Sequence, residues 1–385
     1  MGTEARLSDF MRSPLFPIFL LATVFSGVSS ADPWQRHAVE SARPIDHLSG
    51  ADGVRLADCN DDGRLDIVTG WEEGDAIRIY LHPGLEEVKN PWPATTVGAV
   101  SSPEDAVFAD LDGDGRLDLV SATEGKERTI FAHWAPKREA IADSAAWETA
   151  PFPSTRNRQW WMYTLPLDAD SDGDTDLVIG SKNAGASLSW LENPGPETAR
   201  DLSAWTLHRL TEAGWIMSIR LLEHGGDRHL CYSDRKGPGS GVWLLPILDQ
   251  APWFGDPVRI GAAGEEVMFL DVANLDDDDR PDIVAAIRPD RLRVLYQPEQ
   301  PLRPWPDIAD FDPLPGETYG TMKAVRVGRI DEDGLPDFAL TCERAGGDRV
   351  GVLWTNLHSE FTAIGDGSGI KFDRIELLDL DEEVT

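Results

Sequence analysis

The chain has 385 residues, of which 41% are hydrophobic, so it can bury a sizeable core. Its 35 glycines and 27 prolines favour short elements joined by turns, which indicates an all-β fold. The formal net charge of -33 disfavours a nucleic-acid partner, because affinity for phosphates depends on clustered Lys and Arg side chains. The three cysteines, Cys59, Cys231 and Cys342, form no disulfide framework, so other interactions must stabilise the fold.

Residues 1–31 are predicted to form a signal peptide. Arg6 and Arg12 precede the apolar stretch 14–28, and Ser29 and Ala31 fit a small-residue cleavage pattern. The apolar stretch is too short to span a membrane, and no later segment of about 20 apolar residues follows it. We therefore expect residues 32–385 to form a secreted or periplasmic domain without a transmembrane segment.

Repeats with an acidic loop follow along the rest of the chain. The loops begin at Asp58, Asp110, Asp168, Glu223, Asn274, Arg329 and Asp379. In most repeats a short apolar strand precedes the loop, and a second strand such as DIVTG or DLVSA and a third with aromatic character follow it. A fourth strand is marked by a tryptophan that we expect to pack in the core: Trp92, Trp147, Trp205, Trp253 and Trp305. This pattern predicts one propeller blade per repeat, and hence a seven-bladed β-propeller with four-stranded antiparallel blades.

The last blade is expected to be incomplete at the C-terminus. The sequence stops inside the seventh loop, before any second or third strand. Trp34 carries the mark of a fourth strand ahead of the first repeat, so the segment around it should pair with the repeat that begins near Lys371 and partly complete that blade. Two interpretations remain open: a truncated or frameshifted sequence, or a ring that closes imperfectly and exposes strand edges.

Most of the acidic loops are predicted to bind calcium. Oxygen-bearing side chains at positions 1, 3, 5 and 9 around a tight turn suit Ca²⁺ better than Mg²⁺, which demands a smaller shell. Four loops carry the full pattern: Asp58, Asn60, Asp62, Asp66; Asp110, Asp112, Asp114, Asp118; Asp168, Asp170, Asp172, Asp176; Asn274, Asp276, Asp278, Asp282. A fifth site is possible at Asp331, Asp333 and Asp337, although Arg329 in the first position would compete with the ion. The fourth loop, EHGGDRH, has lost the spacing, and we expect no calcium there.

The alternative interpretation of the loops is a set of turn-forming carboxylates without an ion. Mutual repulsion argues against it, because three or four carboxylates within a few Å destabilise a fold unless a cation neutralises them. These loops and strands resemble the repeats of the FG-GAP/VCBS family and the N-terminal propeller of integrin α subunits, over residues 34–381. The resemblance implies calcium between the first and second strands, on the face away from ligands. It implies little about function, because the fold hosts adhesins and carbohydrate-active enzymes alike.

A ligand site is therefore expected on the opposite face, at the mouth of the central channel. The starts of the first strands bring candidates there: Asp52, Glu104, Asp105, Trp160, Trp161, Trp215, Glu265, Glu266, Lys323, Lys371 and Asp373. The ends of the second strands add Glu72, Glu124, Lys182, Lys236, Arg288 and Glu343. Carboxylates, amines and indoles together suit a sugar. The alternative is a solvated rim above a channel plugged by Met162, Met217 and Met268.

Three functions fit the sequence. The first is a secreted binding or adhesion module for extracellular carbohydrate or protein. The second is a carbohydrate lyase, dehydratase or isomerase, with Glu104, Glu266, Lys323 and Lys371 as candidate acids and bases, although no HExxH, GxSxG or Walker motif is present. The third is a structural scaffold. The position of these four side chains discriminates between them: convergence in one pocket favours an enzyme, and a spread round an open rim disfavours one.

Overall fold

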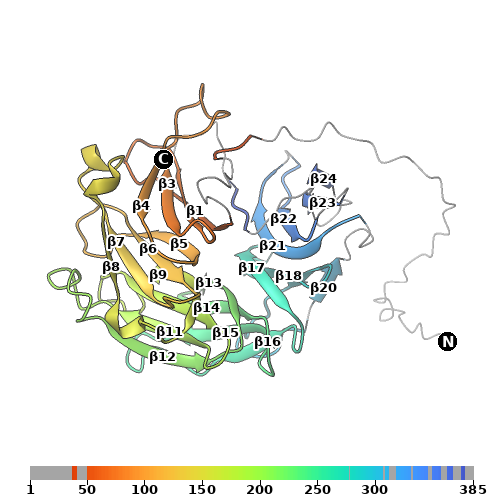
Figure 1. The fold of residues 1–385 in the computed structure, drawn as a ribbon. Helices are drawn as coiled ribbons and strands as arrows, with labels where there is room; N and C mark the ends of the chain where they lie inside the picture. Colours follow the sequence, from red (N-terminus) through yellow and green to blue (C-terminus); the bar gives the residue numbers. More distant parts are fainter. Residues whose placement is uncertain are drawn as a thin grey trace, which may run out of the picture. The chain divides into compact units, whose positions relative to one another are not determined.

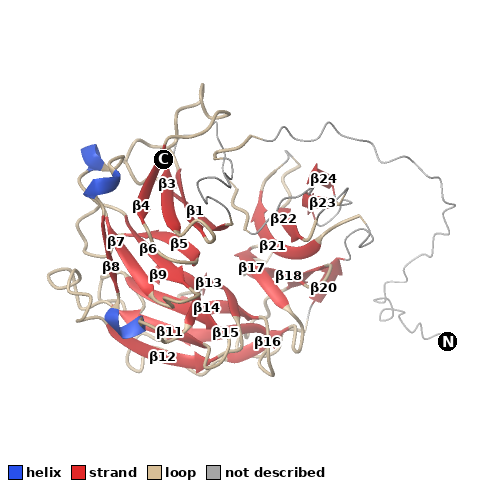
Figure 2. Cartoon of the chain, in the orientation of Figure 1, coloured by secondary structure: helices blue, strands red, loops and turns tan. Residues whose placement is uncertain are grey.

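The computed structural model describes residues 37–40, 50–276, 278–306, 308–311, 318–330, 333–345, 349–356, 362–366 and 374–377. All of them belong to one compact unit, Trp34–Thr385. They form 24 strands and three short 3-10 helices at Arg138–Ala140, Ser144–Ala146 and Pro153–Thr155 (Figure 2). Among these residues, no helix has the length and apolar character needed to cross a membrane.

The strands form six antiparallel sheets of four, each made of strands consecutive in the chain (Figure 1). We call these sheets blades 1 to 6. Blade 1 comprises β1 (Ala51–Ala57), β2 (Asp66–Trp71), β3 (Ala76–Tyr80) and β4 (Ala94–Gly98). Blade 2 comprises β5 (Pro103–Ala109), β6 (Asp118–Thr123), β7 (Ile130–Trp134) and β8 (Glu148–Pro151). Blade 3 comprises β9 (Trp160–Leu167), β10 (Asp176–Lys182), β11 (Ser187–Glu192) and β12 (Thr206–Glu212). Blade 4 comprises β13 (Ile216–His224), β14 (Asp227–Asp234), β15 (Gly241–Ile247) and β16 (Val258–Gly261). Blade 5 comprises β17 (Val267–Ala273), β18 (Asp282–Ile287), β19 (Arg291–Leu295) and β20 (Ile308–Phe311). Blade 6 comprises β21 (Thr321–Gly328), β22 (Asp337–Glu343), β23 (Val350–Asn356) and β24 (Thr362–Asp366).

The first strands of successive blades contact one another, in the order β1, β5, β9, β13, β17 and β21. They therefore line a common centre, as the first strands of a β-propeller do. The second strands are the most deeply buried: every residue of β6, β10 and β18 is buried. Their near-continuous apolar sequences fit a position covered on both faces by neighbouring blades.

Four of the five tryptophans of the fourth segment are buried in the core, as predicted, whereas Trp253 is only partly buried and packs against it. Trp92, Trp147, Trp205 and Trp305 are all buried. Each indole Nε1 donates to a backbone carbonyl four or six residues earlier, at distances between 2.8 and 3.0 Å. The tryptophan therefore fixes the connection between the third and fourth strands while it fills the core.

The structure has six blades within its described part, and the prediction of seven is wrong. The seventh repeat contributes Arg374–Leu377, which belongs to no strand. His37–Glu40 is likewise outside the strands and lies against blade 1, where Trp92 N donates to the carbonyl of Val39 (3.1 Å). A strand needs a partner in its own sheet, and the described residues of the seventh repeat offer none. The predicted pairing of the Trp34 segment with Lys371 lies outside the described residues.

Candidate calcium loops and binding face

The five long acidic loops join the first and second strands of blades 1, 2, 3, 5 and 6, and so lie on one face of the propeller. In each of these five blades, the aspartate at position 9 of the loop begins the second strand and is buried. In blade 2, Asp118 accepts hydrogen bonds from Leu111 N (3.2 Å) in the loop and from Ala135 N (2.7 Å) after the third strand. The same two bonds recur at Asp66, Asp176 and Asp282. This aspartate thus ties each loop to its blade, a role that the sequence analysis missed.

The loops of blades 2 and 3 fit a cation best. The carboxylates of Asp110, Asp112 and Asp118 offer oxygens within 4.8 Å of one another, and those of Asp168, Asp170 and Asp176 do the same. Burial raises the pKa of both Asp118 and Asp176 to about 7.

Several carboxylate oxygens in these two loops are buried without a hydrogen-bond donor: Asp112 Oδ1, Asp168 Oδ1 and Asp170 Oδ1. The turn after position 5 uses glycine with φ of +81° at Gly115 and +97° at Gly173, a conformation that other residues rarely adopt. A hard divalent cation would satisfy these oxygens and neutralise the repulsion between the carboxylates.

The remaining loops are arranged differently. In blade 1, Asn60 Nδ2 donates to Asp62 Oδ2 (3.2 Å), and in blade 5, Arg280 forms an ion pair with Asp278. Arg116 pairs with Asp114 in blade 2 in the same way, but among the described residues the loops of blades 1 and 5 offer no cluster of three carboxylates like those of blades 2 and 3. In blade 4 a two-residue turn, Gly225–Gly226, joins β13 to β14, which leaves no ligand loop. In blade 6, Asp331 lies outside the described residues.

The opposite face carries an acidic cluster above blades 1 and 2. Glu72, Glu104 and Glu124 offer oxygens within 4.8 Å of one another. Lys182, at the end of β10, enters the cluster and pairs with Glu104 (3.2 Å) and with Glu124. Burial and the neighbouring carboxylates raise the pKa of Glu104 to about 8, although the Lys182 ammonium acts in the opposite direction. The cluster is thus a buried carboxyl–amine site, formed from three blades.

Trp215 stands beside this cluster and is surrounded by cations. The Lys182, Arg235 and Lys236 side chains lie 4.8, 4.5 and 4.4 Å from its ring centre. The Asp234 carboxylate holds the tryptophan backbone by accepting from Trp215 N (2.8 Å). Cations at this distance interact favourably with an indole ring.

Ion pairs continue round the mouth above blades 4 to 6. Glu266 Oε2 lies 3.5 Å from Arg235 and 3.7 Å from Arg288. Arg288 also pairs with Glu343, which lies 3.6 Å from Lys323. Three of the predicted acid–base candidates, Glu104, Glu266 and Lys323, therefore each have a counter-ion from another blade or another strand and spread round the rim.

Several other predicted ligand residues are buried or already have partners. Asp52, Asp105 and Trp161 are buried, so Trp161 offers no indole surface for a sugar. Glu265 pairs with Arg291 (2.9 Å) and Arg293 on β19. The ring of Trp160 is covered by Arg128 at 4.9 Å. Lys371 and Asp373 lie outside the described residues.

Asp105 belongs to an ionic network inside the channel. It accepts hydrogen bonds from Thr164 N (2.9 Å) and from Arg55 (3.3 Å), and it pairs with Arg374. The network continues through neighbouring first strands: Arg55 with Glu376 (3.9 Å), Glu376 with Arg326, Arg326 with Asp271 (3.2 Å), and Asp271 with Arg220 (3.3 Å). This network was not expected from the sequence. The sequence does contain an indication of it, because a charged side chain stands three residues before the start of five loops, at Arg55, Arg220, Asp271, Arg326 and Glu376.

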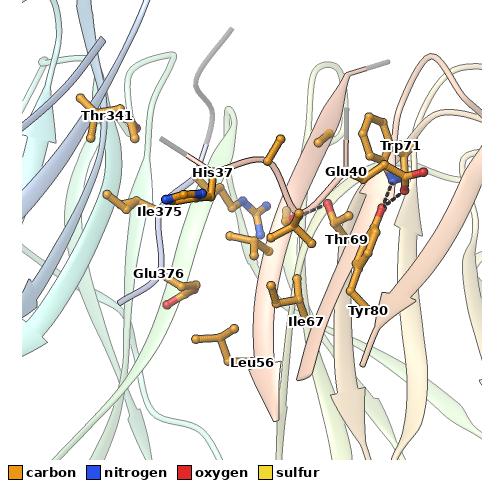
Figure 3. A pocket seen from close by; sticks show the side chains of 17 residues that line it. His37, Glu40, Leu56, Ile67, Thr69, Trp71, Tyr80, Thr341, Ile375 and Glu376 are labelled. Atoms are coloured by element: carbon orange, nitrogen blue, oxygen red, sulfur yellow. Dashed lines mark hydrogen bonds between the residues drawn. The ribbon is translucent and has the colours of Figure 1, made fainter. Parts of the chain in front are cut away.

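A cavity of about 590 Å³ lies at the position of the seventh repeat. Figure 3 shows Trp71 and Tyr80 of blade 1 on one side of it and Thr341 of blade 6 and Ile375 on the other. The Tyr80 hydroxyl accepts from Trp71 Nε1 (2.8 Å) and donates to Glu40 (2.6 Å). The hollow thus lies between blade 1 and blade 6, beside the two segments outside the strands that contain Glu40 and Ile375.

Comparison with known proteins gives one family match. Residues 49–121, which span blade 1 and most of β5 and β6, match the model of the FG-GAP-like repeat. No curated protein matches the chain significantly.

Solved structures similar to the chain include BBS1N in complex with ARL6DN, at 10% identity and a TM-score of 0.41, covering 80% of this chain and 95% of that chain. A luciferin-regenerating enzyme is similar at 11% identity and a TM-score of 0.45, covering 83% and 96%. The repeat match and the four-stranded blades together identify the chain as an FG-GAP-repeat β-propeller protein.

Proposed function

We propose that this chain is a calcium-stabilised, exported binding module that holds an extracellular carbohydrate at the channel mouth opposite the acidic loops. The observation that carries the proposal is the group around Trp215, where an indole, three cations and a carboxylate cluster meet at one mouth. Aromatic surface beside a few fixed polar groups is typical of carbohydrate sites. Export is proposed from the leader-like sequence of residues 1–31.

Calcium is proposed for the loops of blades 2 and 3 first. Each of these loops clusters three carboxylates and contains buried oxygens without a hydrogen-bond donor, although Arg200 pairs with Asp112 in blade 2. An ion that binds only the folded chain stabilises it, which suits an exported protein with three free cysteines. The ion would keep the loop face rigid, and the opposite face would remain available for the ligand.

An enzymatic function is the second candidate, and one observation favours it. Glu104, with a pKa near 8, lies 3.2 Å from Lys182, so in this pair the carboxyl group could donate and accept a proton near neutral pH while Lys182, whose pKa is raised, stays charged. A sugar lyase or dehydratase would use such a pair. Binding ranks first because Glu266 and Lys323, the other described candidates, have counter-ions elsewhere on the rim.

A glycan array with the mature chain in calcium buffer tests the proposal. We expect the wild type to bind a subset of glycans, and Trp215→Ala to lose about tenfold in affinity, which corresponds to an indole contact of about 1.4 kcal/mol. Trp160→Ala is the matched control, because that indole starts β9 on the same face but has one cation, Arg128, at its ring instead of the three that surround Trp215. Thermal melts establish that both variants fold. Equal binding by wild type and Trp215→Ala, or no glycan bound at all, would contradict the proposal.

A further inference from the structure

Basic side chains gather on one half of the channel mouth. Arg235 and Lys236 follow the end of β14, Arg288 follows β18 and Arg344 follows β22. The ends of these second strands lie on the same face of the propeller. Two carboxylates pair with the basic side chains: Glu266, shared by Arg235 and Arg288 through one oxygen, and Glu343, shared by Arg288 and Lys323. A third, Asp234, accepts from Trp215 N and Lys236 N. Positive charge is thus in excess here, in a chain whose net charge is -33.

This half of the mouth also has more N–H donors than acceptors. Trp215 Nε1, Arg235 Nε and Arg288 Nε are all buried without a hydrogen-bond acceptor among the described residues. Arg235 is only 8% exposed. Buried donors in native proteins are nearly always paired, and each unpaired one costs about 1–3 kcal/mol. The surplus of donors indicates a ligand that is rich in acceptor oxygens.

The cations also repel one another. Burial and the proximity of Arg235 lower the pKa of Arg288 to about 10, and Arg344 contributes in the same direction. Burial likewise lowers the pKa of Arg235, with Arg344 again contributing. Glu266 therefore does not neutralise the two arginines that share it. An anion bound between them would relieve the repulsion.

We propose that the Trp215, Arg235 and Arg288 side of the mouth binds the carboxylate of an acidic oligosaccharide, an inference that rests on the carbohydrate-binding function proposed above. The guanidinium fork matches a planar carboxylate with two parallel hydrogen bonds. The other half of the mouth, with Glu104 and Glu124, is rich in acceptors and suits sugar hydroxyls as donors. A uronic acid presents a carboxylate and several hydroxyl donors on one ring, whereas an acidic peptide presents one backbone N–H donor per residue.

Isothermal titration calorimetry with oligogalacturonate tests the inference. The other arms are a neutral galacto-oligosaccharide of equal length, a sulfated oligosaccharide and an oligoglutamate peptide. We expect the wild type to bind oligogalacturonate at least about tenfold more tightly than the neutral sugar, and less tightly as NaCl is raised. The double variant Arg235→Gln and Arg288→Gln should lose this preference. Arg259→Gln, whose guanidinium lies 5.4 Å from the Trp243 ring centre, is the matched control.

Each outcome has a separate meaning. Equal affinity for acidic and neutral sugars, or an unchanged preference in the double variant, overturns the carboxylate inference. The carbohydrate function still stands in that case if Trp215→Ala abolishes binding. Tighter binding of the peptide or of the sulfated sugar also overturns the inference, and no binding of any sugar overturns both proposals. If the double variant fails to fold, the single variants Arg235→Lys and Arg288→Lys replace it. Each keeps the positive charge but removes the planar guanidinium that can bind a carboxylate with two hydrogen bonds. An unchanged preference for the acidic over the neutral sugar in both variants overturns the inference.

Discussion

At the scale of the residue, Glu104 should make the stability of the protein depend on pH. Burial raises its pKa from 4.5 to about 8, so the folded chain holds this proton where the unfolded chain has released it. The folded state then binds more protons, and its free energy of unfolding falls as the pH rises between these two values. Glu104→Gln removes this contribution. We subtract the melting temperature of wild type from that of the variant at each pH. We expect this difference to increase by about 2 °C or more from pH 5 to pH 8.5.

Thermal melts across this pH range measure the difference. Glu86→Gln is the control, because Glu86 is an exposed carboxylate in the loop before β4. Parallel pH profiles for wild type and Glu104→Gln would show that the carboxyl group ionises alike in the folded and unfolded chains. That result would also remove the observation that favours acid–base chemistry at the mouth.

At the scale of the element, the loop of blade 3 should account for part of the stabilisation by calcium. The double variant Asp168→Asn and Asp170→Asn removes two carboxylates, each with a buried oxygen that has no hydrogen-bond donor. We expect calcium to raise the melting temperature of this variant less than that of wild type, since a site at 100 times its Kd contributes about 2.7 kcal/mol. Asp174→Asn is the control, because Asp174 lies in the same loop but outside the 1, 3, 5, 9 pattern.

Melts in calcium and in EDTA must be compared at equal ionic strength. A net charge of -33 means that any added salt stabilises the chain by screening its self-repulsion. A wild-type melt that is the same in both buffers would contradict calcium binding altogether. Equal calcium effects in wild type and in the double variant would place the ion elsewhere.

The sequence predicted the elements better than it predicted their contacts. Loop spacing and the tryptophan marks identified the four-stranded blades, because strand patterns and turns are local features. The group around Trp215 combines side chains from β10, the start of blade 4 and the end of β14, so it depends on how the blades pack. Asp105 was expected at the mouth, but it points into the channel beside Arg55, since adjacent residues on a strand face opposite sides.

At the scale of the whole molecule, ion pairs join Arg374 and Glu376 to first strands of the propeller, in the repeat that was expected to form a seventh blade. Arg374 and Glu376 have no strand partner, yet they join the channel network that connects first strands of several blades. Beyond them lies a cavity of about 590 Å³. The described segment Arg374–Leu377 is therefore held against the blades by ion pairs as well as by the apolar packing of Ile375.

Glu376 is the side chain that tests these ion pairs. It pairs with Arg326 through two hydrogen bonds and lies 3.9 Å from Arg55. Glu376→Gln leaves both guanidinium groups without this carboxylate, and breaking a buried pair costs about 3–5 kcal/mol. We expect urea denaturation to show a loss of about 3 kcal/mol in the free energy of unfolding. Glu223→Gln, which breaks the exposed pair with Arg228, should cost less than about 1 kcal/mol. Equal losses in the two variants would mean that the channel network contributes no more than a surface pair.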